Sequence, residues 1–143
     1  MILLTFCMTL LLLCPLVHGE THRPVTGELV LVITGFESNK GKAMVAVVNS
    51  AETYSENELF RGYRLPISDK RVKRSISLPC GEYAVKIFHD ENANGKLDTR
   101  MFGIPSERYG FSNNARGKYG PPDYEEAAFM VSGKTTRIEI EVR

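Results

Sequence analysis

The chain has 143 residues, of which 43% are hydrophobic and 24% are charged, and these values are typical of one soluble globular domain. Its 18 Lys and Arg residues nearly balance its 17 Asp and Glu residues. This balance excludes the positive field that gathers nucleic acid, so we expect no nucleic-acid partner. The three His residues are too scattered along the chain to predict a zinc site.

An apolar stretch opens the chain, since residues 2–17 contain no charged side chain and many leucines, and the small residue Gly19 follows. This pattern is typical of a secretory signal peptide. We therefore expect a signal peptide over residues 1–19, a linker over residues 20–26 and one domain over residues 27–143. The protein is then exported, to the periplasm, the outer-membrane surface or the extracellular space, and is not an integral membrane protein after cleavage. A retained membrane anchor is the alternative.

Cys80 is the one cysteine that remains after such cleavage, because Cys7 and Cys14 lie inside the predicted signal peptide. It cannot form a disulfide within the mature chain. We interpret Cys80 as a small buried hydrophobic residue, with pairing between two chains as the alternative.

The first two predicted strands follow the linker. Residues 28–34 form a short run of Leu, Val and Ile, which predicts a strand that is buried on both faces. Residues 42–49 form a second apolar run, and residues 38–41 between them read as a turn. We therefore predict that the two strands form a hairpin.

The middle of the chain carries weaker signals. Ser55 precedes two glutamates and is compatible with a single helical turn over residues 55–60, which is too short to support the fold by itself. Basic side chains then gather just before a short strand, at Lys70, Arg71, Lys73 and Arg74. Such charge prevents the edge strand of a sheet from pairing with other chains, and a polyanion site is the alternative interpretation.

Two later segments alternate between apolar and polar side chains. In residues 82–88 the side chains of Tyr83, Val85 and Ile87 share one face, and residues 135–142 show the same period of two. Counting all segments gives six to seven short strands and no long helix. The predicted fold class is therefore all-β, an antiparallel β-sandwich of immunoglobulin-like or transthyretin-like type.

Residues 90–98 place a side-chain oxygen at every second position and then a glycine, Gly95. This spacing matches the first nine places of a calcium-binding loop, in which a glycine makes the turn at the sixth place. We therefore predict calcium as a cofactor, held by side-chain oxygens and one backbone carbonyl, from Asp90, Asn92, Asn94, Lys96 and Asp98. A metal-free turn is the alternative, because Asp, Asn and Gly also form ordinary turns.

The calcium pattern is incomplete at the twelfth place, where an EF-hand has a bidentate Glu and this chain has Met101. A further carboxylate has to fold over from elsewhere, and the candidates are Glu107, Asp123 and Glu125. Because the loop itself offers few carboxylates, we expect weak binding, with a dissociation constant of roughly 10⁻⁴ to 10⁻³ M. A paired-loop docking module is set aside, since the chain has no second copy of the loop.

Residues 102–123 form a long loop rich in Gly, Pro and aromatic residues, and loops of this length in compact domains are usually functional or disordered. Its aromatic side chains give it apolar surface with which to fold down, at Phe102, Tyr109, Phe111, Tyr119 and the following Tyr124. They either stack on a ligand such as a sugar or cap one end of the sandwich. We expect a non-enzymatic module that binds a partner, an envelope component or a glycan through this loop.

The alternative function is a hydrolase. It would use His89 with Asp90 or Glu107 as acid and base and Ser112 as nucleophile, an arrangement that only geometry can identify. A structural histidine beside the loop is the competing interpretation of His89.

Several phrases together resemble a bacterial family of small exported proteins catalogued only as a domain of unknown function, number twenty-one forty-one. These phrases cover residues 81–90, 92–98, 102–105, 109–116 and 120–129. The likeness extends from about Gly27 to the C-terminus. It implies an exported β-sandwich with a signal peptide, and it implies no activity and no catalytic residue.

Overall fold

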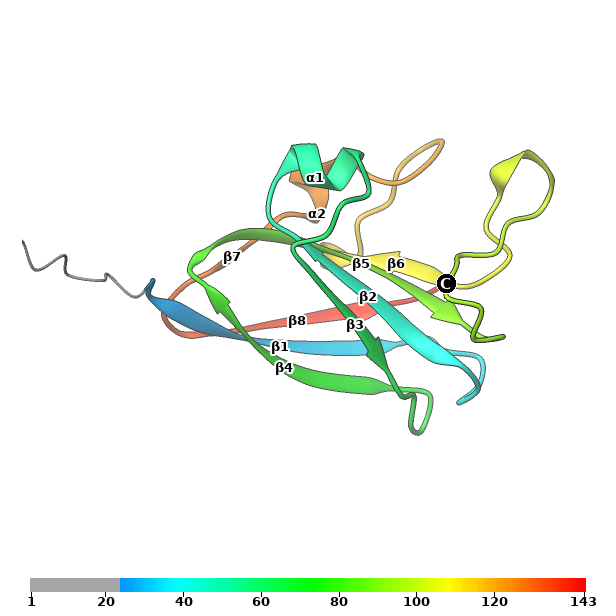
Figure 1. Cartoon of the computed structure of the whole chain (residues 1–143), viewed down its shortest axis with the longest axis horizontal. Helices are drawn as coiled ribbons and strands as arrows, with labels where there is room; N and C mark the ends of the chain where they lie inside the picture. The colour runs from blue at the N-terminus through cyan, green and yellow to red at the C-terminus, as the bar shows by residue number, and fades with distance from the viewer. Residues whose placement is uncertain (1–23) are drawn as a thin grey trace, which may run out of the picture.

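A computed structural model describes residues 24–143, which form two β-sheets packed face to face as a sandwich (Figure 1). The predicted all-β sandwich is therefore confirmed. The predicted signal peptide, with Cys7 and Cys14, lies outside the described residues. Within the described part of the chain, no helix is long and apolar enough to cross a membrane.

The smaller sheet has three strands in the order β4 (Val72–Pro79), β1 (Thr26–Thr34) and β8 (Thr135–Glu141). β1 pairs with β4 in antiparallel fashion and with β8 in parallel fashion, so the first and last strands of the domain are neighbours. The parallel pair departs from a purely antiparallel sandwich. β4 lies at an edge of this sheet, which agrees with the interpretation of its basic residues as protection of an edge strand.

The larger sheet follows the order β3 (Arg61–Leu65), β2 (Lys42–Val48), β5 (Gly81–Asp90) and β6 (Tyr109–Phe111), and β7 (Phe129–Val131) pairs with the beginning of β5. All of these pairs are antiparallel. The predicted hairpin of the first two strands is wrong, because β1 and β2 belong to different sheets. Gly35, with φ of 88°, adopts the left-handed conformation that suits glycine where the chain leaves β1.

The core lies between the two sheets and is built from alternate residues of each strand. β5 contributes Tyr83, Val85 and Ile87, as its alternation predicts. β1 contributes Leu29, Leu31 and Ile33. The sequence interpretation of β1 as buried on both faces holds for Val32, which is fully buried, but not for Val30, which is only half-buried on the outer face.

Two short helices cover part of the outer face of the five-stranded sheet (Figure 1). α1 (Ala51–Ser55) begins after Ser50, whose hydroxyl caps the helix by accepting a hydrogen bond from the Thr53 N–H. The helical turn predicted over residues 55–60 is therefore wrong in position. α2 (Tyr124–Ala127) begins with a capping box formed by Asp123 and Glu126. Single 3-10 turns occur at η1 (Met101–Gly103) and η2 (Ser112–Asn114).

Cys80 is exposed to solvent in the turn between β4 and β5, and it is not in a disulfide with another described residue. The interpretation of Cys80 as a buried hydrophobic residue is therefore wrong. The turn carries Cys80 away from the core that Leu78 and Tyr83 reach on either side of it.

Candidate functional site

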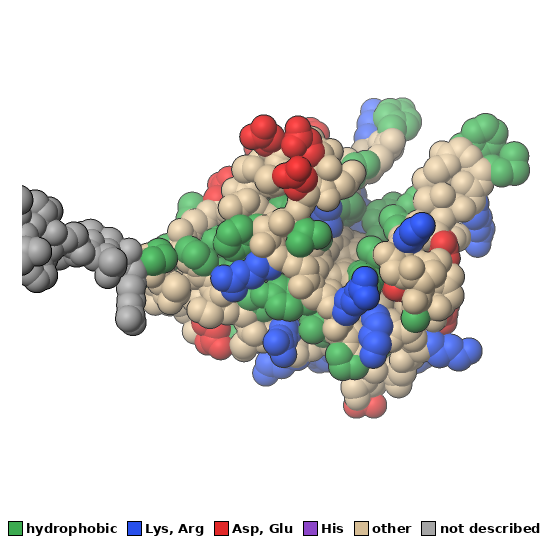
Figure 2. Space-filling view, viewed as in Figure 1, with side chains coloured by type: hydrophobic (Ala, Val, Ile, Leu, Met, Phe, Trp, Pro, Cys, Tyr) green, Lys and Arg blue, Asp and Glu red, His purple; other side chains and the backbone are tan. Residues whose placement is uncertain are grey.

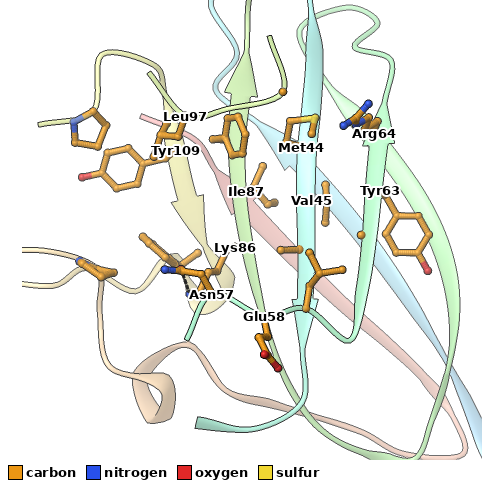
Figure 3. Close-up of a pocket in the computed structure, with 18 of the residues that line it drawn as sticks. Met44, Val45, Asn57, Glu58, Tyr63, Arg64, Lys86, Ile87, Leu97 and Tyr109 are labelled. Carbon is orange, nitrogen blue, oxygen red and sulfur yellow. Dashed lines mark hydrogen bonds between the residues drawn. The ribbon is translucent and has the colours of Figure 1, made fainter. Parts of the chain in front are cut away.

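A cleft of about 860 Å³ lies on the outer face of the five-stranded sheet (Figure 3). Its floor is formed by side chains that alternate with the core residues of each strand. β2 supplies Met44 and Ala46, and β5 supplies Lys86 and Phe88. β6 adds Tyr109 and Phe111, which lie opposite Phe88 and Lys86 in the strand pairing. The floor is therefore largely apolar and aromatic.

Loops from distant parts of the chain form the walls of this cleft. One wall is the segment just after α1. The others come from the loop over residues 90–98, here called the calcium-type loop, and from the long aromatic loop over residues 102–123. The residues that line the walls are Asn57, Glu58, Leu59, Gly95, Leu97, Thr99, Gly103, Pro105, Gly120 and Pro121. The long loop thus forms part of the cleft wall.

Lys86 lies at the α1 end of the cleft (Figure 3). Its Nζ donates hydrogen bonds to the Tyr54 carbonyl oxygen at 2.5 Å and to Asn57 Oδ1 at 3.1 Å, and it lies 3.9 Å from the centre of the Tyr54 ring. The Tyr54 carbonyl is one that the end of α1 leaves without a partner within the helix. Burial lowers the pKa of Lys86. This ammonium group is therefore largely committed to holding α1.

Arg64 lies on the other side of the cleft, on β3 (Figure 3). It is exposed, and although its backbone pairs with Met44 of β2, its side chain forms no hydrogen bond or ion pair with the described residues. The backbone of Gly95 lies close by, since a Cβ added at Gly95 would be 3.6 Å from the nearer Arg64 nitrogen. Arg64 is therefore available to pair with a charge on a ligand.

Two buried tyrosines fix the helices beside the cleft. The Tyr54 hydroxyl donates a hydrogen bond to the Pro122 carbonyl oxygen at 3.0 Å, and its ring packs edge-on against Tyr124 with centroids 5.8 Å apart. Burial is the main cause that raises the pKa of each of these tyrosines to about 12, with nearby carboxylates adding to the effect. Both helices are therefore joined to each other and to the sheet.

The calcium-type loop is ordered by hydrogen bonds to its own backbone. The Asp90 carboxylate is 2% exposed and accepts hydrogen bonds from the N–H groups of Asn94 at 2.9 Å and Gly95 at 2.8 Å. Asn92 Oδ1 also accepts from the Asn94 N–H, and Asn94 Oδ1 accepts from the Lys96 N–H. Gly95 has φ of 79°, as the sixth-place turn requires. The predicted turn geometry is present.

The side chains of Asn92 and Asn94 both meet the Asp98 carboxylate in this loop. The Nδ2 groups of Asn92 and Asn94 donate hydrogen bonds to the two Asp98 oxygens at 2.6 Å and 3.0 Å. The amide N–H groups therefore take the place beside Asp98 that a cation would need. Over residues 24–143, no three His, Cys, Asp or Glu side chains are close enough to hold a metal ion. The Lys96 backbone N–H donates a hydrogen bond to Asn94 Oδ1 at 2.8 Å.

Glu107 is the proposed extra carboxylate that reaches the loop. Its Oε1 accepts a hydrogen bond from the Glu91 N–H at 3.1 Å, and its Oε2 accepts one from the Asp98 N–H at 3.0 Å. The other two candidates lie at α2, where Asp123 caps the helix and Glu125 is in its first turn. Glu107 therefore ties the aromatic loop to the calcium-type loop.

His89 and Ser112 have separate structural roles. His89 is 3% exposed, its Nε2 is hydrogen-bonded to the Lys40 carbonyl oxygen at 2.8 Å, and its ring packs edge-on against Phe36. The Ser112 hydroxyl is fully buried, where it accepts from the Val85 N–H and donates to the Ala127 carbonyl oxygen. The two side chains share no hydrogen bond, so the geometry gives the hydrolase hypothesis no support.

The aromatic residues of the long loop divide into three groups. Tyr109 and Phe111 lie in the cleft floor, and Tyr124 is buried in α2. Phe102 and Tyr119 are instead 93% and 94% exposed. The strand residues of the cleft floor were not predicted from the sequence, although the apolar residues Phe88 and Met44 on the outward faces of their strands are a signal of such a floor.

The family model described as "Uncharacterized protein conserved in bacteria (DUF2141)" matches residues 31–139. These residues run from within β1 to within β8 and include the whole cleft and the calcium-type loop. No curated protein and no solved structure matches the chain.

Proposed function

The chain belongs to the DUF2141 family, whose description names no activity. We therefore propose a function that is based on the residues of the cleft. The family match confirms the resemblance seen in the sequence. The proposed function is that of an exported, non-enzymatic binding module. Its ligand is an envelope component with an elongated apolar chain and an acidic end group.

The apolar floor between ordered walls is the observation that carries this proposal. A volume of about 860 Å³ falls within the range of roughly 300–1,000 Å³ that is usual for small-molecule sites. Apolar side chains left facing outward on a sheet are costly unless a ligand covers them, and Met44, Phe88 and Tyr109 lie side by side in this position. An acyl chain would remove their surface from water at about 25 cal/mol per Å².

Arg64 supports the choice of an acidic end group. It is an uncommitted cation at the cleft, whereas Lys86 is held by Tyr54 and Asn57. A carboxylate or phosphate on the ligand would complement the Arg64 guanidinium. The polar groups that line the cleft are few compared with its apolar ones, which favours an acyl chain over a glycan.

Calorimetric titration with hexadecanoate, hexadecanol and a neutral oligosaccharide tests this proposal. Ala46→Phe fills the centre of the floor and should abolish binding of both long-chain compounds. Ser75→Phe is the matched control, because it adds the same side chain at an exposed position of β4 and should leave binding unchanged. Arg64→Gln should weaken hexadecanoate binding and spare hexadecanol. Binding of the oligosaccharide alone would overturn the proposal in favour of a glycan module.

We also propose that the loop over residues 90–98 takes up calcium weakly. Binding would require the Asn92 and Asn94 amides to turn, so that their oxygens replace the N–H groups now directed at Asp98. The bonds lost in this exchange offset part of the metal–ligand energy, which is consistent with a dissociation constant of roughly 10⁻⁴ to 10⁻³ M. Calcium would then stabilise one wall of the cleft.

A further inference from the structure

Two loop tips expose most of their large apolar side chains. In the hairpin over residues 99–105 the exposed fractions are 77% for Met101, 93% for Phe102 and 60% for Ile104. In the loop over residues 113–122 Tyr119 is 94% exposed. The two most exposed large apolar side chains of the described chain therefore lie on these two tips. Figure 1 shows both loops projecting from the same side of the sandwich as α1 and α2.

The first tip is an ordered turn. The Arg100 N–H donates to the Ile104 carbonyl oxygen at 2.7 Å, the Gly103 N–H donates to the Arg100 carbonyl oxygen at 3.2 Å, and Thr99 pairs with Pro105. Phe102 is held at φ 64° and ψ 21°, a left-handed conformation that favours Gly or Asn. Neither its backbone conformation nor its exposure favours Phe at this position in an isolated domain. A surface that receives the ring would account for it.

The charged residues within both tips are basic, whereas Asp98 and Glu107 flank the first tip and Asp123 follows the second. Residues 99–106 contain Arg100 and no acidic residue, and residues 113–122 contain Arg116 and Lys118 and no acidic residue. The Lys118 ammonium lies 5.7 Å from the centre of the Tyr119 ring. Figure 2 shows acidic side chains gathered over α1 and the residues after it, and α2 carries Asp123, Glu125 and Glu126. Each tip thus combines an exposed apolar group with adjacent basic groups.

We propose that the two tips dock on an anionic lipid bilayer. The apolar side chains would enter the boundary between headgroups and acyl chains, while Arg100, Arg116 and Lys118 contact the lipid phosphates. A bilayer fits better than a protein because the apolar groups stand apart on two turns. A fluid surface can accommodate each of them, whereas a protein partner would need two matched pockets. Docking by the two tips does not depend on the ligand of the cleft.

Single tryptophans provide a local test, because the chain contains none. Phe102→Trp and Tyr119→Trp each introduce one reporter at a tip, and Met130→Trp introduces one on β7 at an exposed position away from both loops. The proteins carry identical N-termini, verified by mass spectrometry, and are mixed with vesicles of equal parts phosphatidylglycerol and phosphatidylcholine. Emission from positions 102 and 119 should shift to shorter wavelength, and emission from position 130 should not. Unchanged emission at both tips, or an equal shift at position 130, would overturn the proposal.

Loss of binding is the second test. Removing two apolar groups in Phe102→Ser/Tyr119→Ser should weaken vesicle partitioning by about tenfold or more. Val25→Ser/Met130→Ser is the matched control, because it also removes two exposed apolar side chains and should leave partitioning within about twofold of the original protein. Binding to anionic vesicles should decrease at high ionic strength and be weak on pure phosphatidylcholine. Equal binding to both vesicle types, or equal losses in the two double variants, would contradict the model.

Discussion

The Lys86 ammonium lies 3.9 Å from the centre of the Tyr54 ring and donates a hydrogen bond to the carbonyl oxygen of the same residue. One lysine of β5 therefore holds both the side chain and the backbone end of α1. This contact fixes the wall of the cleft that follows α1, and it explains why a cation is retained on a floor that is otherwise apolar.

Lys86→Met should loosen α1 while keeping the apolar stem of the side chain in place. We expect a loss of roughly 1 kcal/mol in the free energy of unfolding, because the hydrogen bonds are lost while the desolvation of a charge is relieved. Amide hydrogen exchange should accelerate over residues 51–58 and stay unchanged in β1. Uniform acceleration across the domain, or none in α1, would show that Lys86 does not hold the helix.

Alkaline pH should destabilise the domain through Tyr54 and Tyr124. The pKa of each is raised to about 12 in the fold, against an ordinary value of 10.0. The unfolded chain therefore loses these protons first, so their contribution is complete below about pH 10 and decreases as the pH rises towards 12. Thermal unfolding between pH 9 and 12, which spans roughly both pKa values, measures this loss. Tyr54→Phe and Tyr124→Phe should each reduce it, and Tyr119→Phe, at an exposed position, should not.

Calcium should raise the melting temperature of the protein relative to a chelator. At a free concentration about ten times the dissociation constant, the gain is roughly 1.4 kcal/mol. Asp98→Ala should remove this increment and also lower the melting temperature in chelator, because both Asn amides lose their acceptor. Glu91→Ala, at an exposed carboxylate of the same loop outside the predicted ligand set, should keep the increment. Identical melting of the original protein in millimolar calcium and in chelator would identify the loop as a metal-free turn.

Ser112→Ala should destabilise the protein although it removes a single hydroxyl group. The Val85 N–H would be left without its acceptor in a fully buried position, which costs about 1–3 kcal/mol. Ser75→Ala, at an exposed position, should change the free energy of unfolding by less than about 0.5 kcal/mol. Chemical denaturation compares the two variants directly. Equal effects would mean that the Ser112 hydroxyl does not bridge β5 and α2.

The regular strands could be predicted because their burial follows a local pattern. In β8, and in β5 apart from Ala84, which is buried beneath the helices, one face meets the core between the sheets and the other does not, so the side chains alternate along the chain. The alternation of apolar and polar side chains is lost in β1, because the apolar residue Val32 lies on the outer face. It is buried there between Lys73 and Glu139, its neighbours in the strand pairing. The aliphatic stems of such residues can cover apolar surface, so burial on both faces does not require a second core.

Strand partners and the cleft depend on contacts between distant residues. Turn residues after β1 suggested a hairpin, but Gly35 leads the chain to the other sheet, and this choice depends on which strands meet later in the fold. The cleft floor combines residues of three strands, so no single stretch of sequence identifies it. The calcium-type loop could be predicted because the spacing of its side-chain oxygens lies within one short stretch of sequence. The orientation of its two Asn amides could not, because it depends on how they contact Asp98 in the folded loop.

The parallel pairing of β1 with β8 has a consequence for how the protein is made. β1 lies between β4 and β8, so the smaller sheet cannot be completed until Thr135–Glu141, close to the C-terminus, has been synthesised. At about 5–20 residues per second, the ribosome leaves the earlier strands without this partner for several seconds. Closing so long a loop also slows folding itself. The domain should therefore fold only after its last strand has emerged from the ribosome, and until then chaperones can bind the apolar face of β1.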